Sequence, residues 1–120
     1  MQKILIIDDE STLRLLMRKF LEKSGYVVTE AEDGEKGILQ AKKDKPDLIL
    51  LDVTMPKMNG YQVDQELGAD PTLRKIPVIL VTGTYQVVGD GIKLKTHAKY
   101  KLAKPFDRDQ LINIVKTALG

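Results

Sequence analysis

Five short aliphatic runs, far apart along the chain, constrain the fold more than any other feature of the sequence. They cover residues 4–7, 27–31, 48–51, 78–81 and, more weakly, 100–103. The segments between them are 16 to 26 residues long, which is too long for hairpins. Three of the runs are apolar at every position, as strands covered on both faces are. The runs therefore predict the inner strands of a parallel sheet.

Helical periodicity fills most of the intervening segments. An amphipathic helix is predicted ahead of a stop at Ser24 and Gly25. Near the other end, Asp107 and Gln110 form a capping-box pattern in front of a last helix. The apolar positions that define these two helices are Leu13, Leu16, Met17, Phe20 and Leu21 in the first, and Leu111, Ile114, Val115 and Ala118 in the last.

Shorter helices are predicted over 35–43 and over 59–67, the second ending at Gly68. Segment 85–95 contains Gly89 and Gly91, each worth about 1 kcal/mol against a helix relative to alanine. We therefore expect a helix in segment 85–95 to be mobile or partly unwound.

The alternation of strands and helices predicts an α/β fold. Right-handed crossovers between parallel strands give a doubly wound sheet with helices on both faces. A chain of 120 residues is long enough to bury a core without disulfides or structural metals. We expect one domain over residues 1–120, with ligands bound beyond the carboxyl ends of the strands.

Composition excludes several classes of protein. The chain has no cysteine, which rules out disulfides, thiolate zinc sites and thiol nucleophiles. Its aliphatic runs are far shorter than the roughly 20 residues of a membrane helix, and the start of the chain lacks the apolar stretch of a secretory signal. A formal net charge of +2 gives little support for nucleic-acid binding. We expect a cytoplasmic protein with no membrane insertion.

Polar side chains stand at the predicted carboxyl ends of the strands. Asp8 and Asp9 follow the first run, Asp52 the third, Thr82 the fourth and Lys104 the fifth. Each of them alone also has an ordinary structural explanation, such as a helix cap, a strand residue or a solvated surface. In a parallel sheet, however, all five lie along one edge. The prediction of a functional site depends on their meeting there.

Three carboxylates in one place would oppose folding unless a cation accompanied them. Two like charges about 4 Å apart repel by about 4 kcal/mol at an effective dielectric near 20. Lys104 offsets one of the negative charges, and a hard divalent cation would offset two more. Mg²⁺ typically takes one or two carboxylates and keeps positions for waters and a phosphate oxygen. We therefore expect Mg²⁺ as the cofactor and a phosphoryl compound as the substrate.

Phosphoryl transfer needs an in-line nucleophile and neutralisation of charge on the phosphoryl oxygens. Asp52 is the candidate nucleophile, which would become an aspartyl phosphate. Lys104 and the Thr82 hydroxyl are candidates to bind the phosphoryl oxygens. The set of residues thus supplies each part that the reaction requires.

With these motifs the chain resembles the receiver domain of two-component response regulators. The resemblance covers essentially all 120 residues and rests on the order and spacing of the motifs. The motifs are the pair Asp8 and Asp9, Asp52 within LILLDVTMPKMNG, Thr82 within VILVTG, and Lys104 within LAKPF.

The resemblance implies a flavodoxin-like five-stranded sheet ordered 2-1-3-4-5. It implies Mg²⁺ held by Asp8, Asp9, Asp52 and the backbone carbonyl of Thr54. Asp52 would accept a phosphoryl group from a histidine kinase or phosphotransfer protein, and the domain would catalyse its own phosphorylation and dephosphorylation. It also implies a cis peptide bond between Lys104 and Pro105.

The resemblance further implies a switch. Thr82 would move toward the phosphoryl group, and the surface around strand 100–103 and its flanking helices would change its affinity for a downstream output protein. The position three before the lysine usually holds Tyr or Phe, and here it is Lys101. Tyr100 points to the opposite face of the strand and cannot simply replace it. An alternative function is therefore open, a receiver-fold interaction module that signals without phosphorylation.

Other interpretations have less support. A haloacid-dehalogenase-type phosphatase needs a second acid two residues after the nucleophile, where this chain has Thr54. A nucleotide-binding protein needs a glycine-rich loop after the first strand, which is missing. Segment 93–104 has five lysines, one histidine and no acid, which fits a solvated face or the docking of an acidic partner. The sequence fits both a stand-alone regulator and a receiver from a larger protein.

Overall fold

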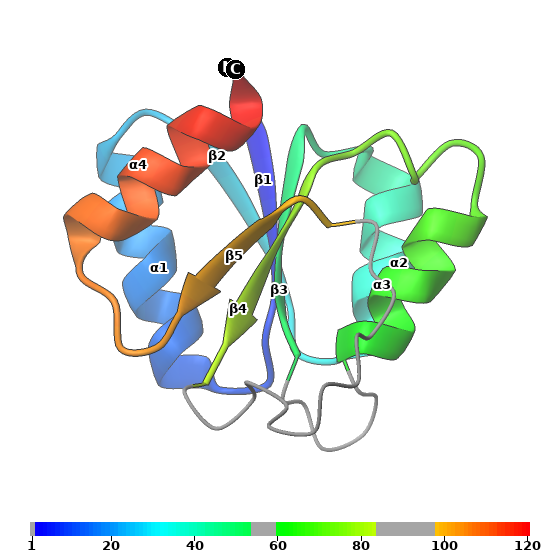
Figure 1. Ribbon diagram of the computed structural model, residues 1–120, viewed down its shortest axis with the longest axis horizontal. Coiled ribbons are helices and arrows are strands. Elements are labelled where there is room, and N and C mark those ends of the chain that lie inside the picture. Colours follow the sequence, from blue (N-terminus) through cyan, green and yellow to red (C-terminus); the bar gives the residue numbers. More distant parts are fainter. Residues whose placement is uncertain (1, 54–59, 84–97) are drawn as a thin grey trace.

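The computed structural model describes residues 2–53, 60–83 and 98–120 (Figure 1). Thr54 and the helix predicted over 85–95 lie outside the described residues. Five strands form one parallel sheet with the order β2-β1-β3-β4-β5. The strands are β1 (Lys3–Ile7), β2 (Val27–Ala31), β3 (Leu48–Asp52), β4 (Val78–Thr82) and β5 (Tyr100–Ala103). The predicted flavodoxin-like strand order is confirmed.

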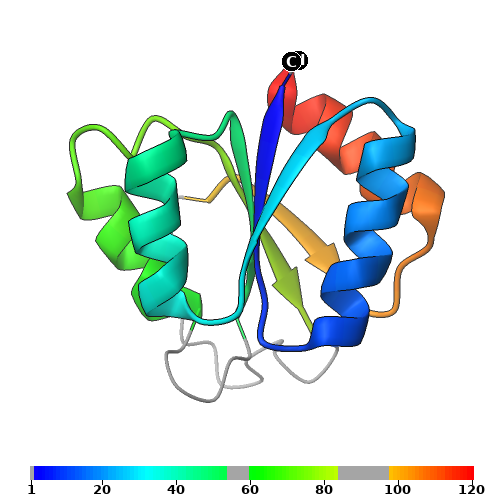
Figure 2. The ribbon, with the colours of Figure 1, turned by 180° about the vertical axis from the view of Figure 1, so that it is seen from behind.

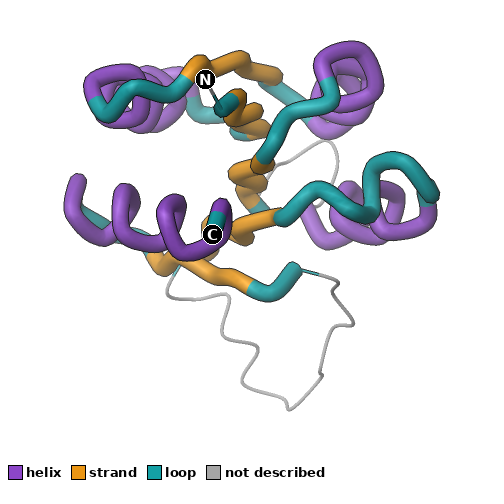
Figure 3. The backbone as a smooth tube through the Cα atoms, turned by 90° about the horizontal axis from the view of Figure 1, so that it is seen from above, coloured by secondary structure: helices purple, strands orange, loops and turns teal. Residues whose placement is uncertain are grey.

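Helices cover both faces of the sheet, as predicted. The described helices are α1 (Ser11–Lys23), α2 (Gly34–Asp44), α3 (Gly60–Ala69) and α4 (Arg108–Leu119). Helices α1 and α4 lie on one side and α2 and α3 on the other, which Figures 1 and 2 show from opposite directions. Viewed along the strands, the sheet separates the two pairs of helices (Figure 3).

The core is divided by the sheet into two apolar layers. Alternate residues of β1 face different layers. Ile4 and Ile6 pack toward α1 and α4, while Leu5 and Ile7 pack toward α2 and α3. All five residues of β3 are buried, which explains why its sequence is an uninterrupted aliphatic run up to Asp52.

Side chains fix the starts of two helices. Asp33 accepts a hydrogen bond from the Lys36 amide at 2.8 Å and caps α2. Asp107 and Gln110 form the predicted capping box at the start of α4. Glu10, which precedes α1, makes no side-chain cap, so this helix start depends on other contacts.

Two helix predictions were wrong in detail. Helix α3 continues through Gly68 to Ala69, because the fully buried Leu67 anchors its last turn against the core and outweighs the glycine. Leu16 is 43% exposed, because the buried stripe of α1 follows Met17 and Leu21. None of the described helices is long and apolar enough to cross a membrane.

Candidate metal centre

Strand register brings two acids to equivalent positions on neighbouring strands. Ile7 of β1 pairs with Leu51 of β3, so that Asp8 and Asp52 come next on each strand. The Asp8 amide donates to the Ala31 carbonyl at 3.1 Å and extends the pairing of β1 with β2 by one residue. Both side chains are buried, with 0% of Asp8 and 2% of Asp52 exposed. Both carboxylates therefore form the buried base of the site, at the edge of the sheet where the strands end (the carboxyl edge).

Asp9 completes a cluster of three carboxylates at this edge. Asp8, Asp9 and Asp52 each offer one oxygen, and these oxygens all lie within 4.8 Å of one another. Asp9 is exposed, unlike the other two. The cluster is thus open to solvent on the side of Asp9 and closed by the sheet beneath Asp8 and Asp52.

Lys104 follows the edge strand β5 and reaches the cluster from there. Its Nζ lies 3.1 Å from Asp52 Oδ2, and its amide donates to the Thr82 carbonyl at 2.7 Å. The bond between Lys104 and Pro105 is cis. Thr82 ends β4 at the same edge and is half-buried, and its role toward a phosphoryl group stays a prediction.

The electrostatics of Asp8 set it apart from an ordinary surface acid. Its Oδ1 accepts from the Glu10 amide at 2.9 Å, whereas its buried Oδ2 has no hydrogen-bond donor among the described residues. Burial raises the pKa of Asp8 to about 7, against the opposing effect of the Glu10 amide. The negative charge of Asp52 raises this pKa further, as does a hydrogen bond that Asp52 accepts from the protonated Asp8 carboxyl, while the charge of Lys104 lowers it.

The three acids fit a hard divalent cation. With all of them ionised, Lys104 leaves the cluster with a surplus of two negative charges. The buried Asp8 Oδ2 faces this surplus without a donor, which is the environment that a cation with oxygen ligands satisfies. The residues present therefore suit Mg²⁺, with Asp8, Asp9 and Asp52 as candidate ligands.

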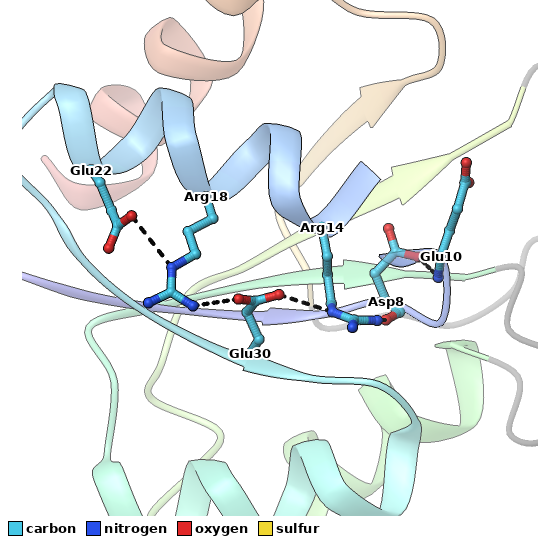
Figure 4. Close-up of polar contacts among 6 residues, drawn as sticks. All are labelled: Asp8, Glu10, Arg14, Arg18, Glu22 and Glu30. Carbon is cyan, nitrogen blue, oxygen red and sulfur yellow. Dashed lines mark hydrogen bonds and ion pairs between the residues drawn. The ribbon is translucent and has the colours of Figure 1, made fainter. Parts of the chain in front are cut away.

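An ion-pair network behind the cluster was missed in the sequence (Figure 4). Arg14 of α1 donates to the Asp8 carbonyl at 2.7 Å and to Glu30 of β2 at 3.0 Å. Arg18, one turn later, donates to the other Glu30 oxygen at 2.6 Å and pairs with Glu22. The two arginines are four residues apart on one helix, a signal that becomes informative once β2 is placed beside α1.

The two residues that bear on the predicted switch lie as the strand alternation requires. Tyr100 packs with the core layer of α1 and α4, together with Leu102. Lys101, between them, is exposed. The prediction that Tyr100 and Lys101 face opposite sides of β5 is confirmed.

Comparisons with known proteins agree with this geometry. Residues 4–116 match the response regulator receiver domain family. The chain is 36% identical to the protein PilH of Pseudomonas aeruginosa over 120 residues, which covers 100% of the chain and 99% of PilH. It is 43% identical to the response regulator PleD of Caulobacter vibrioides over 117 residues, covering 96% of the chain and 25% of PleD. The chain therefore spans PilH but only a quarter of PleD.

Solved structures give the same result. The receiver domain of a sensor histidine kinase from Pseudomonas aeruginosa matches with a TM-score of 0.89 and 31% identity, over 99% of this chain and 98% of that one. That structure has a magnesium ion coordinated in its active site cleft. A response regulator receiver domain protein from Methanospirillum hungatei has a TM-score of 0.87 and 26% identity, with 99% and 94% coverage. The chain belongs to the response regulator receiver domain family of two-component signalling.

Proposed function

We propose that the chain, as a single domain over residues 1–120, accepts a phosphoryl group on Asp52 in a Mg²⁺-dependent reaction. The observation that carries this proposal is the juxtaposition of three carboxylate oxygens within 4.8 Å and a lysine ammonium 3.1 Å from Asp52. A buried carboxylate in such surroundings meets both the charge and the position that a phosphoryl acceptor requires.

Each residue of the site has its own role in this reaction. Asp8, Asp9 and Asp52 would hold Mg²⁺. The backbone carbonyl of Thr54 would be a fourth ligand, and this ligand is proposed from the family resemblance alone. When bound, Mg²⁺ neutralises negative charge on the cluster and on a phosphoryl oxygen. Lys104 neutralises a second phosphoryl oxygen, and the Thr82 hydroxyl donates to a third.

The transfer is a displacement at phosphorus. An Asp52 oxygen forms a bond to the phosphorus atom of a phosphohistidine, the phosphorus–nitrogen bond breaks, and the imidazole keeps the electron pair and takes up a proton. The donor is a histidine kinase or a phosphotransfer protein. Water then attacks the phosphorus, which returns the Asp52 carboxylate and releases inorganic phosphate. The surface around β5 and its neighbouring helices presents the signal to a downstream output protein.

Incubation with acetyl phosphate and Mg²⁺, followed by intact-mass measurement, tests the proposal. The native chain should gain the mass of one phosphoryl group, and Asp52→Asn should gain none. Asp109→Asn, which changes an exposed acid of α4 in the same chemical way, is the matched control and should be labelled like the native chain. Absence of label on all three would favour the interaction module that signals without phosphorylation.

A further inference from the structure

The turn that carries Asp8 and Asp9 is held in place by backbone and side-chain contacts. The Asp8 amide is bound to the Ala31 carbonyl of β2, and the Asp8 carboxylate accepts from the Glu10 amide. The Asp8 carbonyl accepts from Arg14 Nη1 at 2.7 Å. Since Glu10 supplies no side-chain cap to α1, the Arg14 contact ties this turn to the body of the helix.

Arg14 is itself held from the opposite side. Its Nε donates to Glu30 Oε1 at 3.0 Å, while Arg18 Nη1 donates to Glu30 Oε2 at 2.6 Å (Figure 4). The Arg14 and Glu30 side chains are 16% and 23% exposed. Burial opposes the charge of Glu30, but hydrogen bonds from Arg18 and Arg14 outweigh it and lower the pKa of this carboxyl. Arg14 thus uses two N–H groups of its planar guanidinium, one on Glu30 and one on the Asp8 carbonyl. Charge-assisted hydrogen bonds of this kind are directional, and they fix where the guanidinium points.

We propose that Arg14 is a positioning residue of the metal centre, which fixes the Asp8 carbonyl and thereby directs the Asp8 and Asp9 carboxylates at the ion. Glu30 of β2 holds the guanidinium in the required orientation by accepting from Arg14 Nε, whereas Arg18 binds the other Glu30 oxygen. The inference rests on the proposed function, because it presupposes that these acids bind Mg²⁺.

Charge and position make opposite predictions for Arg14. A guanidinium beside a cation site repels the cation, so that removing a mere charge would strengthen Mg²⁺ binding. Removing a partner that orients a ligand typically weakens metal binding 10–100-fold. The direction of the change in Mg²⁺ affinity therefore separates the two roles without reference to protein stability.

The test is a Mg²⁺ titration of the isotopically labelled chain, followed by backbone amide chemical shifts. Arg14→Gln should weaken Mg²⁺ binding about 10-fold or more. Arg18→Gln is the matched control, since it also removes a guanidinium from Glu30 but does not contact Asp8. Its Mg²⁺ affinity should stay within about twofold of the native value. Arg14→Lys keeps the charge without the planar fork and should also bind more weakly than the native chain.

A kinetic readout accompanies the titration. The rate of acetyl phosphate labelling of Arg14→Gln should recover to near the native rate when Mg²⁺ is saturating, so that the defect lies in the Mg²⁺ concentration required. If Arg14→Gln does not fold, Arg14→Lys measured against Arg18→Gln decides. Equal or tighter Mg²⁺ binding by the Arg14 variants, or equal weakening in Arg18→Gln, would overturn the inference. Failure of the native chain to bind Mg²⁺ would instead refute the proposed function.

Discussion

Replacing Asp8 by asparagine should stabilise the metal-free protein at neutral and alkaline pH. Asp8 is fully buried, its Oδ2 has no donor among the described residues, and the Asp52 carboxylate lies beside it. Asparagine keeps an oxygen that accepts from the Glu10 amide and replaces Oδ2 by an NH₂ group that can donate to Asp52. The substitution therefore removes a buried charge and leaves the shape of the site unchanged.

The size of the effect follows from the pKa of Asp8. That pKa is raised from 3.8 to about 7, and each pH unit corresponds to about 1.4 kcal/mol. The ionised carboxylate thus costs the native state at most about 4 kcal/mol. Because Asp8 and Asp52 share the repulsion, we expect the free energy of unfolding to rise by about 2–4 kcal/mol at about pH 8.

The sign of the pH dependence is fixed by the same shift. A raised pKa means that the native state holds the Asp8 proton more tightly than the unfolded chain does. The resulting stabilisation is complete below the unfolded pKa of 3.8 and is lost as the pH rises through about 7. The native chain should therefore lose stability relative to Asp8→Asn over this interval.

Urea unfolding in the presence of a chelator, at about pH 5 and about pH 8, measures the difference. The advantage of Asp8→Asn should be larger at the higher pH, whereas Asp109→Asn should show no such trend. Added Mg²⁺ should stabilise the native chain and leave Asp8→Asn nearly unaffected. A variant that is no more stable than the native chain at about pH 8 would show that the acids are not crowded as described.

Three further substitutions test other parts of the structure. In Gly60→Ala the new methyl would lie 2.3 Å from the Asp52 carbonyl oxygen and the Val53 Cα, so urea unfolding should show a loss of about 1–3 kcal/mol; an unchanged midpoint would mean that α3 shifts freely. Asp107→Ala removes the capping box of α4 and should cost about 1 kcal/mol in thermal unfolding, with an unaltered melting curve as the contrary result. Lys104→Met removes the ammonium group 3.1 Å from Asp52 and should slow acetyl phosphate labelling about 100-fold; a native rate would assign that role elsewhere.

Most of the fold was predictable because its signals are local. The strand β3 is buried on both faces, which leaves an aliphatic run that ends at Asp52, and the capping box of α4 is visible as Asp107 and Gln110. The end of α3 was misplaced because Gly68 weakens a helix locally, while the burial of Leu67 acts through tertiary packing. Propensity yields to packing at such positions.

The acid cluster was predictable in its members, since each follows a recognisable strand. The ion pairs that hold the Asp8 turn in place were not predictable. Arg14 and Glu30 are 16 residues apart on different elements, and their contact depends on the rotation of α1 and the register of β2. The pairing of Glu30 with Ile6 fixes that register, and a single sequence gives no direct measure of it.

Binding of Mn²⁺ in place of Mg²⁺ tests the metal centre most directly, because a paramagnetic ion broadens the resonances of nearby amides. We expect low concentrations of Mn²⁺ to broaden the amides of Asp8, Asp9 and Asp52 first, and we expect excess Mg²⁺ to restore them. Other acids, Glu32, Asp33 and Glu35, lie around the start of α2. Broadening that instead centres on these three, or that excess Mg²⁺ does not reverse, would contradict a divalent cation site formed by Asp8, Asp9 and Asp52.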